Sequence, residues 1–86
     1  MPGISRKDTD TAGGTIIEGS SDVLIENKGA VRIGDAVAGH GIEKHAAPKM
    51  ETGSGTVFVN NIQVCREGDT ADCGDAATGS GTVSAG

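Results

Sequence analysis

The sequence predicts an all-β protein, built as a stack of short β-hairpins from about three pseudo-repeats. Fifteen glycines among 86 residues oppose long helices, because each glycine costs roughly 1 kcal/mol in a helix interior. The same glycines suit a chain with many tight turns. Short apolar runs alternate with turn residues, and the chain repeats its own pattern. The length allows a single domain over residues 1–86.

The internal repeat is the clearest of these observations. Residues 19–35 and residues 53–69 align without a gap. A third copy begins at residues 79–83, and Arg6-Lys7-Asp8 matches the degenerate end of a preceding copy. Such a period indicates that each unit is one supersecondary element packed against the next. The identical positions are Gly19/Gly53, Ser20/Ser54, Val23/Val57, Asn27/Asn61, Arg32/Arg66, Gly34/Gly68 and Asp35/Asp69.

Each full unit predicts a hairpin. Residues 23–25 form a short apolar run typical of a strand, and residues 27–29 supply turn residues that tolerate positive φ. Residues 30–33 predict the return strand. The Gly-Asp pair at 34–35 ends the unit, and we expect its aspartate to bond nearby N–H groups rather than to carry chemistry. The second unit repeats this order over residues 57–69.

The predicted core is weak. Hydrophobic residues make up 35% of the chain, and Phe58 is the only aromatic residue. A domain of this size buries a modest fraction of its surface even with an ordinary core. We therefore expect an additional source of stability, which is a metal, a disulfide or a partner surface.

Charge and hydropathy exclude several classes of function. The formal net charge is −5, and the seven Lys and Arg residues form no basic stripe, so we expect no nucleic-acid partner. No apolar run follows the N-terminus, which predicts synthesis in the cytoplasm without a signal peptide. No stretch approaches the ~20 apolar residues of a membrane helix. Any export is then expected to use a dedicated machine.

The two His and two Cys residues are the candidate metal ligands. His40 and His45 lie in the longest connector, between Asp35 and Gly53, and an insertion of this kind indicates a functional loop. Structural zinc prefers four nitrogen or sulfur ligands, so the set predicts a structural zinc site, with iron also possible. Bound metal would also add folding free energy. The four residues are His40, His45, Cys65 and Cys73.

Other interpretations of these residues remain open at this stage. A Cys65–Cys73 disulfide is disfavoured in a cytoplasmic chain. Cys65 aligns with Val31 of the preceding unit and is therefore also compatible with a small buried hydrophobic role. His45 is compatible with a solvated loop position. His40 and Cys73 follow the Gly-Asp turns of successive units at nearly equivalent positions, which favours them most.

The alternative function from the same residues is a small zinc-dependent hydrolase. It would use His40, His45 and a cysteine as ligands, with Glu43 as the base. A metalloprotease helix places two histidines four residues apart, so that both lie on one helical face. The spacing of His40 and His45 would instead separate them by about 140° around a helix. Gly39 and Gly41 also oppose a helix here.

Taken in order, the repeated motifs resemble the PAAR repeat family. The resemblance rests on Gly-Ser-x-x-Val, then Asn, then a pair of small residues before Arg-x-Gly-Asp, and it covers nearly the whole chain. The pairs before arginine are Ala30-Val31 and Val64-Cys65, so the motif that names the family is degenerate. The C-terminal run over residues 68–83 and the His-bearing connector are also similar to the family pattern.

The resemblance implies a cone of hairpins with zinc near its vertex, which in the family is bound by three His and one Cys. It also implies a non-enzymatic tip protein that caps and sharpens a trimeric β-helical spike, one copy per trimer, for membrane puncture. The spike belongs to a phage tail or to the valine-glycine repeat spike protein of a type VI secretion system. The protein is then expected at the virion tail tip or secreted through the machine, with transient contact to the target membrane.

The resemblance implies less about individual residues. The spike-binding strands cannot be identified from sequence, although Ile16, Ile17, Val57 and Val83 are candidate base contacts. Ala12 stands where the family often has a histidine, and Cys65 is the expected replacement ligand. Arg6-Lys7-Asp8 lacks the glycine of the Gly-Asp turn. Nothing follows Gly86, so no fused toxin domain is expected.

Overall fold

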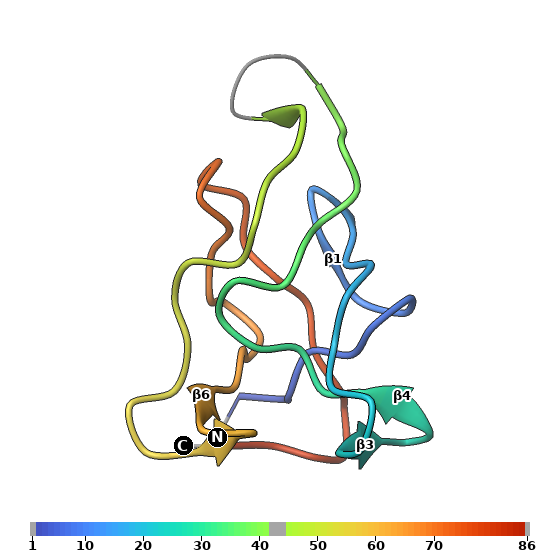
Figure 1. The fold of residues 1–86 in the computed structure, drawn as a ribbon, viewed down its shortest axis with the longest axis vertical. Helices are drawn as coiled ribbons and strands as arrows, with labels where there is room; N and C mark the ends of the chain where they lie inside the picture. The colour runs from blue at the N-terminus through green and yellow to red at the C-terminus, as the bar shows by residue number, and fades with distance from the viewer. Residues whose placement is uncertain (1, 42–44, 86) are drawn as a thin grey trace.

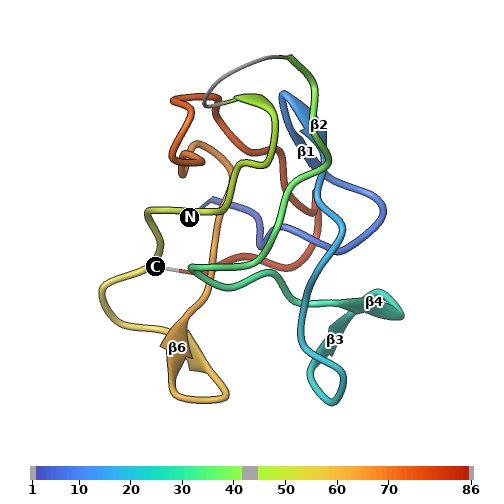
Figure 2. The ribbon, with the colours of Figure 1, turned by 45° about the horizontal axis from the view of Figure 1, so that its top comes forward.

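The computed structural model describes residues 2–41 and 45–85. The described chain tapers along its longest axis (Figure 1), with extents of 32 × 23 × 23 Å. Both termini and two of the hairpins lie at one end, which we call the broad end (Figure 1). Loops gather at the opposite end, which we call the narrow end, and the turned view in Figure 2 agrees.

The regular elements of the described residues are short strands paired as antiparallel hairpins, which confirms the all-β prediction. The pairs are β1 (Thr11–Ala12) with β2 (Gly14–Thr15), β3 (Leu24–Ile25) with β4 (Lys28–Gly29), and β5 (Phe58–Val59) with β6 (Ile62–Gln63). None of the described residues forms a helix that is long and apolar enough to cross a membrane.

The two broad-end hairpins turn on residues with positive φ. Glu26 and Asn27 have φ of 55° and 69°, and Asn60 and Asn61 have φ of 54° and 64°. Two consecutive positive φ values define the turn whose twist matches a β-hairpin. The return strands therefore begin earlier than the sequence predicted, at Lys28 and Ile62, since the turn needs only two residues.

A third corner of the broad end is made by the two ends of the chain. The amide of Ile4 donates to the carbonyl of Val83 at 2.8 Å, and the amide of Ala85 donates to the carbonyl of Pro2 at 2.9 Å. The first of these bonds matches the one from Ala30 to Val23 at the start of hairpin β3–β4. Segments 2–4 and 83–85 therefore pair as a hairpin does, without a connecting turn.

The three corners are joined at the centre by a closed cycle of backbone hydrogen bonds. Val31 donates to Ser5 at 3.0 Å, Ser5 donates to Cys65 at 3.0 Å, and Cys65 donates to Val31 at 2.8 Å. All three residues are fully buried. Each buried backbone group in the cycle is satisfied by the next unit, so the units cannot separate without exposing unpaired amides.

One residue after each member of this cycle, an arginine is clamped to an aspartate. In each clamp the arginine backbone N–H and Nε donate to Oδ2 of the aspartate, and Nη2 donates to Oδ1. The expected role of the aspartates in bonding nearby N–H groups is confirmed for these units. The pairs are Arg6–Asp10, Arg32–Asp35 and Arg66–Asp69.

The first clamp corrects the alignment of the N-terminal copy. Asp8, which the sequence matched to the clamp aspartates, instead has φ of 60° and occupies the position of Gly34 and Gly68, with φ of 92° and 91°. The first unit has one additional residue between the arginine and the clamp aspartate, so that Asp10 pairs with Arg6. The Gly that seemed to be missing from this copy is replaced by an aspartate in the same left-handed conformation.

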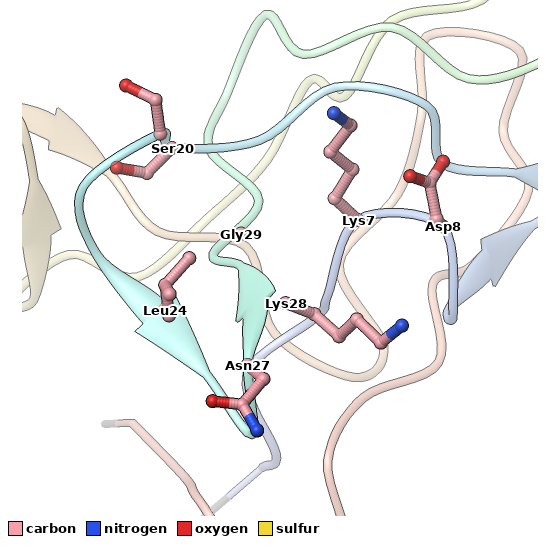
Figure 3. Close-up of a pocket in the computed structure, with 8 residues that line it drawn as sticks. Lys7, Asp8, Ser20, Leu24, Asn27, Lys28 and Gly29 are labelled. Atoms are coloured by element: carbon pink, nitrogen blue, oxygen red, sulfur yellow. The ribbon is translucent and has the colours of Figure 1, made fainter.

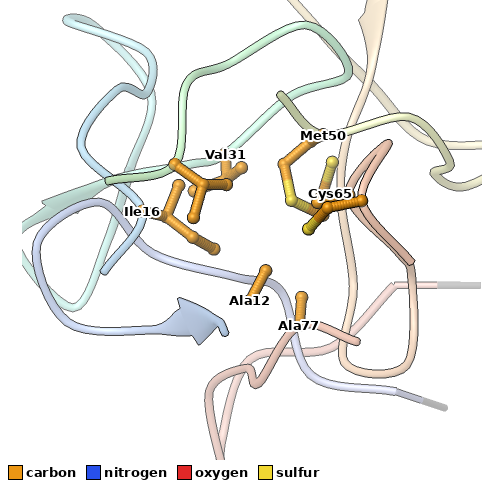
Figure 4. Packing of buried hydrophobic residues seen from close by; sticks show 9 residues of the cluster. Ala12, Ile16, Val31, Met50, Cys65 and Ala77 are labelled. Carbon is orange, nitrogen blue, oxygen red and sulfur yellow. The ribbon is translucent and has the colours of Figure 1, made fainter. Parts of the chain in front are cut away.

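Buried apolar side chains of the described residues form two clusters. The cluster towards the narrow end is shown in Figure 4 and includes Ile16, Val31, Met50, Cys65 and Cys73 among its members. The other contains Ile4, Ile25, Ala30, Val59, Val64 and Ala85, with Val57 and Val83 partly buried against it. The expectation that Ile16 is a base contact is wrong, because its side chain is fully buried in the first cluster.

Candidate metal centre

Three loops of unequal length form the narrow end, and each follows a clamp aspartate. They span residues 11–15, 36–49 and 70–76. Isolated bridges tie the ends of these loops together: Ile16, which follows the first loop, pairs with Val37, and Met50, which follows the second, pairs with Ala71. The second loop carries both histidines, and the third carries Cys73 and the aspartates Asp72 and Asp75.

Four side chains from the two longer loops converge on one point. His40, His45, Cys73 and Asp75 each direct one ligand atom to the group, and all four atoms lie within 4.8 Å of one another. His40 Nε2 lies 2.6 Å from Asp75 Oδ2 and 3.1 Å from His45 Nδ1. Cys73 Sγ lies 3.7 Å from His40 Nε2 and 3.4 Å from Asp75 Oδ2.

His40 is held in the tautomer that a metal ligand requires. Its Nδ1 lies 3.1 Å from the carbonyl of Ala38, to which only a protonated nitrogen can donate. Nε2 faces the cluster, where it donates to Asp75 Oδ2 when protonated and offers its lone pair to a metal when the ring is neutral. A backbone carbonyl on the far nitrogen is a common way of orienting metal-binding histidines. The bonds to Ala38 and Asp75 also raise the pKa of His40.

The contacts of His40 Nε2 exceed what one nitrogen can satisfy. Asp75 Oδ2, His45 Nδ1 and Cys73 Sγ all approach it, but an imidazole nitrogen offers either one proton or one lone pair. A cation at the centre of the group would interact favourably with all four atoms together. Two imidazoles, a thiolate and a carboxylate are donors that zinc accepts, so these residues fit a divalent metal ion.

The short loop contributes space rather than a ligand. Gly13 has φ of 85°, and a Cβ at this position would collide with Asp75 Oδ2 and with His40 Nε2. Gly14 lies against the Ala38 carbonyl and the His40 ring in the same way. Ala12, where the family often has a histidine, is fully buried in the core. The glycine pair lets the two longer loops close over the first.

Cys65 lies outside this group. Its side chain is fully buried in the core, where Sγ donates to the Thr52 carbonyl at 3.4 Å, and Figure 4 shows it packed near Met50. Burial raises the pKa of the Cys65 thiol to about 12, so the thiolate that binds metals is disfavoured. The expectation that Cys65 replaces the missing ligand is corrected: its backbone belongs to the central cycle, which fixes the residue in the core. Cys65 and Cys73 are both free thiols.

Asp75 is the member of the group that sequence reasoning missed. The only signal was its position two residues after Cys73, with a glycine between them. Gly74 has φ of 92°, which reverses the chain so that Cys73 and Asp75 face the same point. His45, which was also compatible with a solvated loop, makes an edge contact with the His40 ring at a centroid distance of 5.1 Å. Glu43, the base of the hydrolase hypothesis, lies outside the described residues.

A separate groove of about 340 Å³ lies beside hairpin β3–β4 (Figure 3). Lys7, Lys28 and Asp8 are its charged residues, and Leu24 is its largest apolar residue. Among the described residues that line it, none is a histidine or a cysteine. The groove therefore offers no ligand set comparable to the one at the narrow end.

Comparison with known proteins gives a family match for this chain. The PAAR motif family model matches residues 6–84, which is most of the chain. The match includes all three clamps and all four residues of the narrow-end group. No curated protein gives a significant match to the chain.

Proposed function

Because this chain belongs to the PAAR motif family, we propose that it is a non-enzymatic tip protein, seated by its broad end on the trimeric spike of a contractile injection machine. PAAR motif proteins are associated with spike tips of type VI secretion and phage-like systems. One observation carries the proposal for this chain. Its potential metal ligands gather at the narrow end, while exposed apolar side chains lie on the hairpins of the broad end.

The broad end has the properties of a docking surface. Leu24 on β3 and Phe58 on β5 are 54% and 56% exposed, and Val23 and Ile62 on the same two hairpins are also exposed. Exposed apolar side chains that gather on one end favour burial by a partner. A base with three corners suits a spike with three chains, so one copy would cap each trimer. Strand addition at the corners would continue the sheets of the spike.

At the narrow end, we propose a structural zinc ion held by the four-residue group. Zinc would join the second and third loops and would stiffen the point that meets the target membrane. Iron is the alternative metal. A structural role requires a filled coordination shell, whereas a zinc hydrolase requires an open position for water. Four converging ligand atoms favour the structural role.

The route of the protein follows from the same proposal. It would be made in the cytoplasm and assembled onto the spike there. It would then reach either the virion tail tip or, through a secretion machine, the surface of a target cell. Both kinds of machine are compatible with the base and tip described above.

Mixing the protein with a purified trimeric spike β-helix tests the proposal. We expect one copy per trimer by light scattering coupled to gel filtration. Phe58→Asp should weaken the complex, because it places a charge in the buried interface. Ile17→Asp is the matched control, since Ile17 is 45% exposed but lies outside the broad-end hairpins. Failure to bind any cognate spike, or loss of binding in the Ile17 variant alone, would contradict the proposed orientation.

A further inference from the structure

We infer that Asp75 is the fourth metal ligand of this chain, so that its narrow end holds a divalent ion in a His₂CysAsp site rather than the His₃Cys site that the family resemblance implies. The inference rests on the proposed metal-binding role of the narrow end. It adds the identity of the donor that replaces the missing histidine, and the charge and metal preference that follow.

The first argument is the turn that carries Cys73 and Asp75. The amide of Gly74 donates to the carbonyl of Ala71 at 2.9 Å, and the amide of Ala71 donates to the carbonyl of Asp75 at 3.0 Å. These bonds close a tight loop around Gly74, whose left-handed conformation a residue with a side chain rarely adopts. Both side chains leave the turn on the same side, with Sγ and Oδ2 3.4 Å apart.

The second argument is the spacing of the four atoms. Bond lengths of about 2.0–2.1 Å to nitrogen or oxygen and about 2.3 Å to sulfur place tetrahedral ligands roughly 3.3–3.6 Å apart. Asp75 Oδ2 lies 3.4 Å from both Cys73 Sγ and His45 Nδ1. His40 Nε2 lies 3.1 Å from His45 Nδ1 and 3.7 Å from Cys73 Sγ. The hydrogen-bonded pair His40–Asp75, at 2.6 Å, must widen, and the remaining pair, His45–Cys73, lies within 4.8 Å.

The third argument is that the surroundings are fitted to a carboxylate at this place. Gly13 leaves the space that Asp75 Oδ2 and His40 Nε2 occupy, since a Cβ there would meet both atoms. Asp75 Oδ2 lies 2.6 Å from His40 Nε2 and 3.4 Å from Cys73 Sγ, so the carboxylate oxygen faces the other candidate ligands. Cys65, the other candidate, is held in the core by its backbone bonds to Ser5 and Val31.

The donor set determines the charge and the preferred metals of the site. One thiolate and one carboxylate cancel the charge of a divalent ion, whereas three histidines and one thiolate would leave one positive charge. A single sulfur donor with nitrogen and oxygen donors favours Zn²⁺ or Co²⁺ over Cu⁺, which prefers thiolates and thioethers. The site is therefore expected to be neutral and specific for borderline divalent ions.

Titration of metal-free protein with Zn²⁺ and with Co²⁺ tests the assignment, with Co²⁺ absorption reporting the coordination geometry. We expect one tetrahedral ion per wild-type chain, by the ligand count. Asp75→Asn should weaken Zn²⁺ binding by about 100-fold or more, since even orienting residues around a metal contribute about 10- to 100-fold. Asp75→His should retain tight binding with a shifted Co²⁺ spectrum, because nitrogen replaces oxygen. Cys65→Val, which copies Val31 at the equivalent position, should leave affinity and spectrum unchanged.

The outcomes separate this inference from the proposed function. If wild-type protein binds neither ion, the metal-binding proposal fails as a whole. If wild-type protein binds and Asp75→Asn binds equally well with the same spectrum, only the assignment of Asp75 is overturned. Loss of binding in Cys65→Val, with circular dichroism unchanged, would assign the ligand to Cys65 instead. Should Asp75→Asn not fold, the Asp75→His spectrum decides, and an unshifted spectrum would exclude Asp75 as a ligand.

Discussion

The two ends of the molecule are built on opposite plans. At the broad end the same contacts recur at three corners: Ser20, Ser54 and Ser80 are buried, and each hydroxyl accepts the amides two and three residues later. At the narrow end the three loops differ in length and sequence, and the ligand-bearing side chains come from two of them. Repetition therefore stabilises the base, whereas departure from the repeat brings the candidate metal ligands together.

Metal removal should give the largest difference in behaviour between the two ends. We expect chelation to lower the free energy of unfolding by about 5 kcal/mol or more, because structural zinc contributes directly to folding. Hydrogen exchange should accelerate in residues 36–49 and 70–76 before it does in hairpins β3–β4 and β5–β6. Equal acceleration at both ends would contradict the division of roles, and restoring Zn²⁺ is the control for reversibility.

Breaking one clamp should destabilise the base next most strongly. Arg66→Ala leaves the buried Asp69 carboxylate without its guanidinium partner, which should cost about 3 kcal/mol in chemical denaturation. Lys28→Ala removes an exposed cation of the same end and should change stability by less than about 0.5 kcal/mol. Zn²⁺ affinity should survive in both variants. A neutral effect of Arg66→Ala would show that the clamps do not hold the units together.

Adding one methyl group at Gly13 should damage the narrow end alone. Gly13→Ala combines a left-handed backbone with a collision against Asp75 and His40, so we expect about 2 kcal/mol of destabilisation and weaker Zn²⁺ binding. Gly68→Ala is the matched control. Its φ of 91° carries a similar strain, but no atom lies within 4 Å of the added carbon. We expect Gly68→Ala to lower the free energy of unfolding by about 1–2 kcal/mol and to leave Zn²⁺ affinity intact.

The sequence predicted the base better than the tip for a physical reason. A repeated hairpin leaves a periodic record, so Val23, Val57 and the Gly-Asp turns could be aligned. The group at the tip depends instead on how Gly74 reverses the chain, which brings Asp75 beside His40, 35 positions away. The third corner was also hidden, because the pairing of Ile4 with Val83 joins opposite ends of the sequence. Cys65 was misassigned because its residue type suggested a ligand while its repeat position indicated core.

Acidic pH should weaken the Arg66–Asp69 and Arg6–Asp10 clamps, whereas a change of pH near neutrality should not. Burial raises the pKa of Asp69, but hydrogen bonds from Arg66 outweigh it and hold the pKa below the ordinary value of 3.8. Asp10 behaves in the same way with Arg6 and Thr78. For these two carboxylates the stability is present above the ordinary pKa and is lost as the pH falls through the lower folded pKa. When the pH falls from about 5 to about 2.5, Asp69→Asn should lose less stability than wild type, as measured by urea unfolding at both pH values.

The smallest expected effect concerns a single serine at one corner. Ser54→Ala removes the acceptor for the amides of Thr56 and Val57, which should lower stability by about 1 kcal/mol. Ser20→Ala at the equivalent corner should cost a similar amount, and thermal unfolding would measure both. A clear inequality between the two corners would show that their side chains, rather than the shared backbone pattern, govern stability.

The unjoined third corner bears on how the chain folds. Ser5 Oγ bonds the carbonyl of Thr78 across 73 positions, and the pairing of segments 2–4 and 83–85 spans a similar distance. A circular permutant that linked these segments by a two-residue turn, and opened the chain at Asn27 instead, would keep every contact of the folded state except that turn. Segments 2–4 and 83–85 would then lie close together in the sequence, whereas β3 and β4 would lie far apart in it. Because folding rates follow the sequence separation of contacts, the order in which the corners form should be reversed while the final structure stays the same.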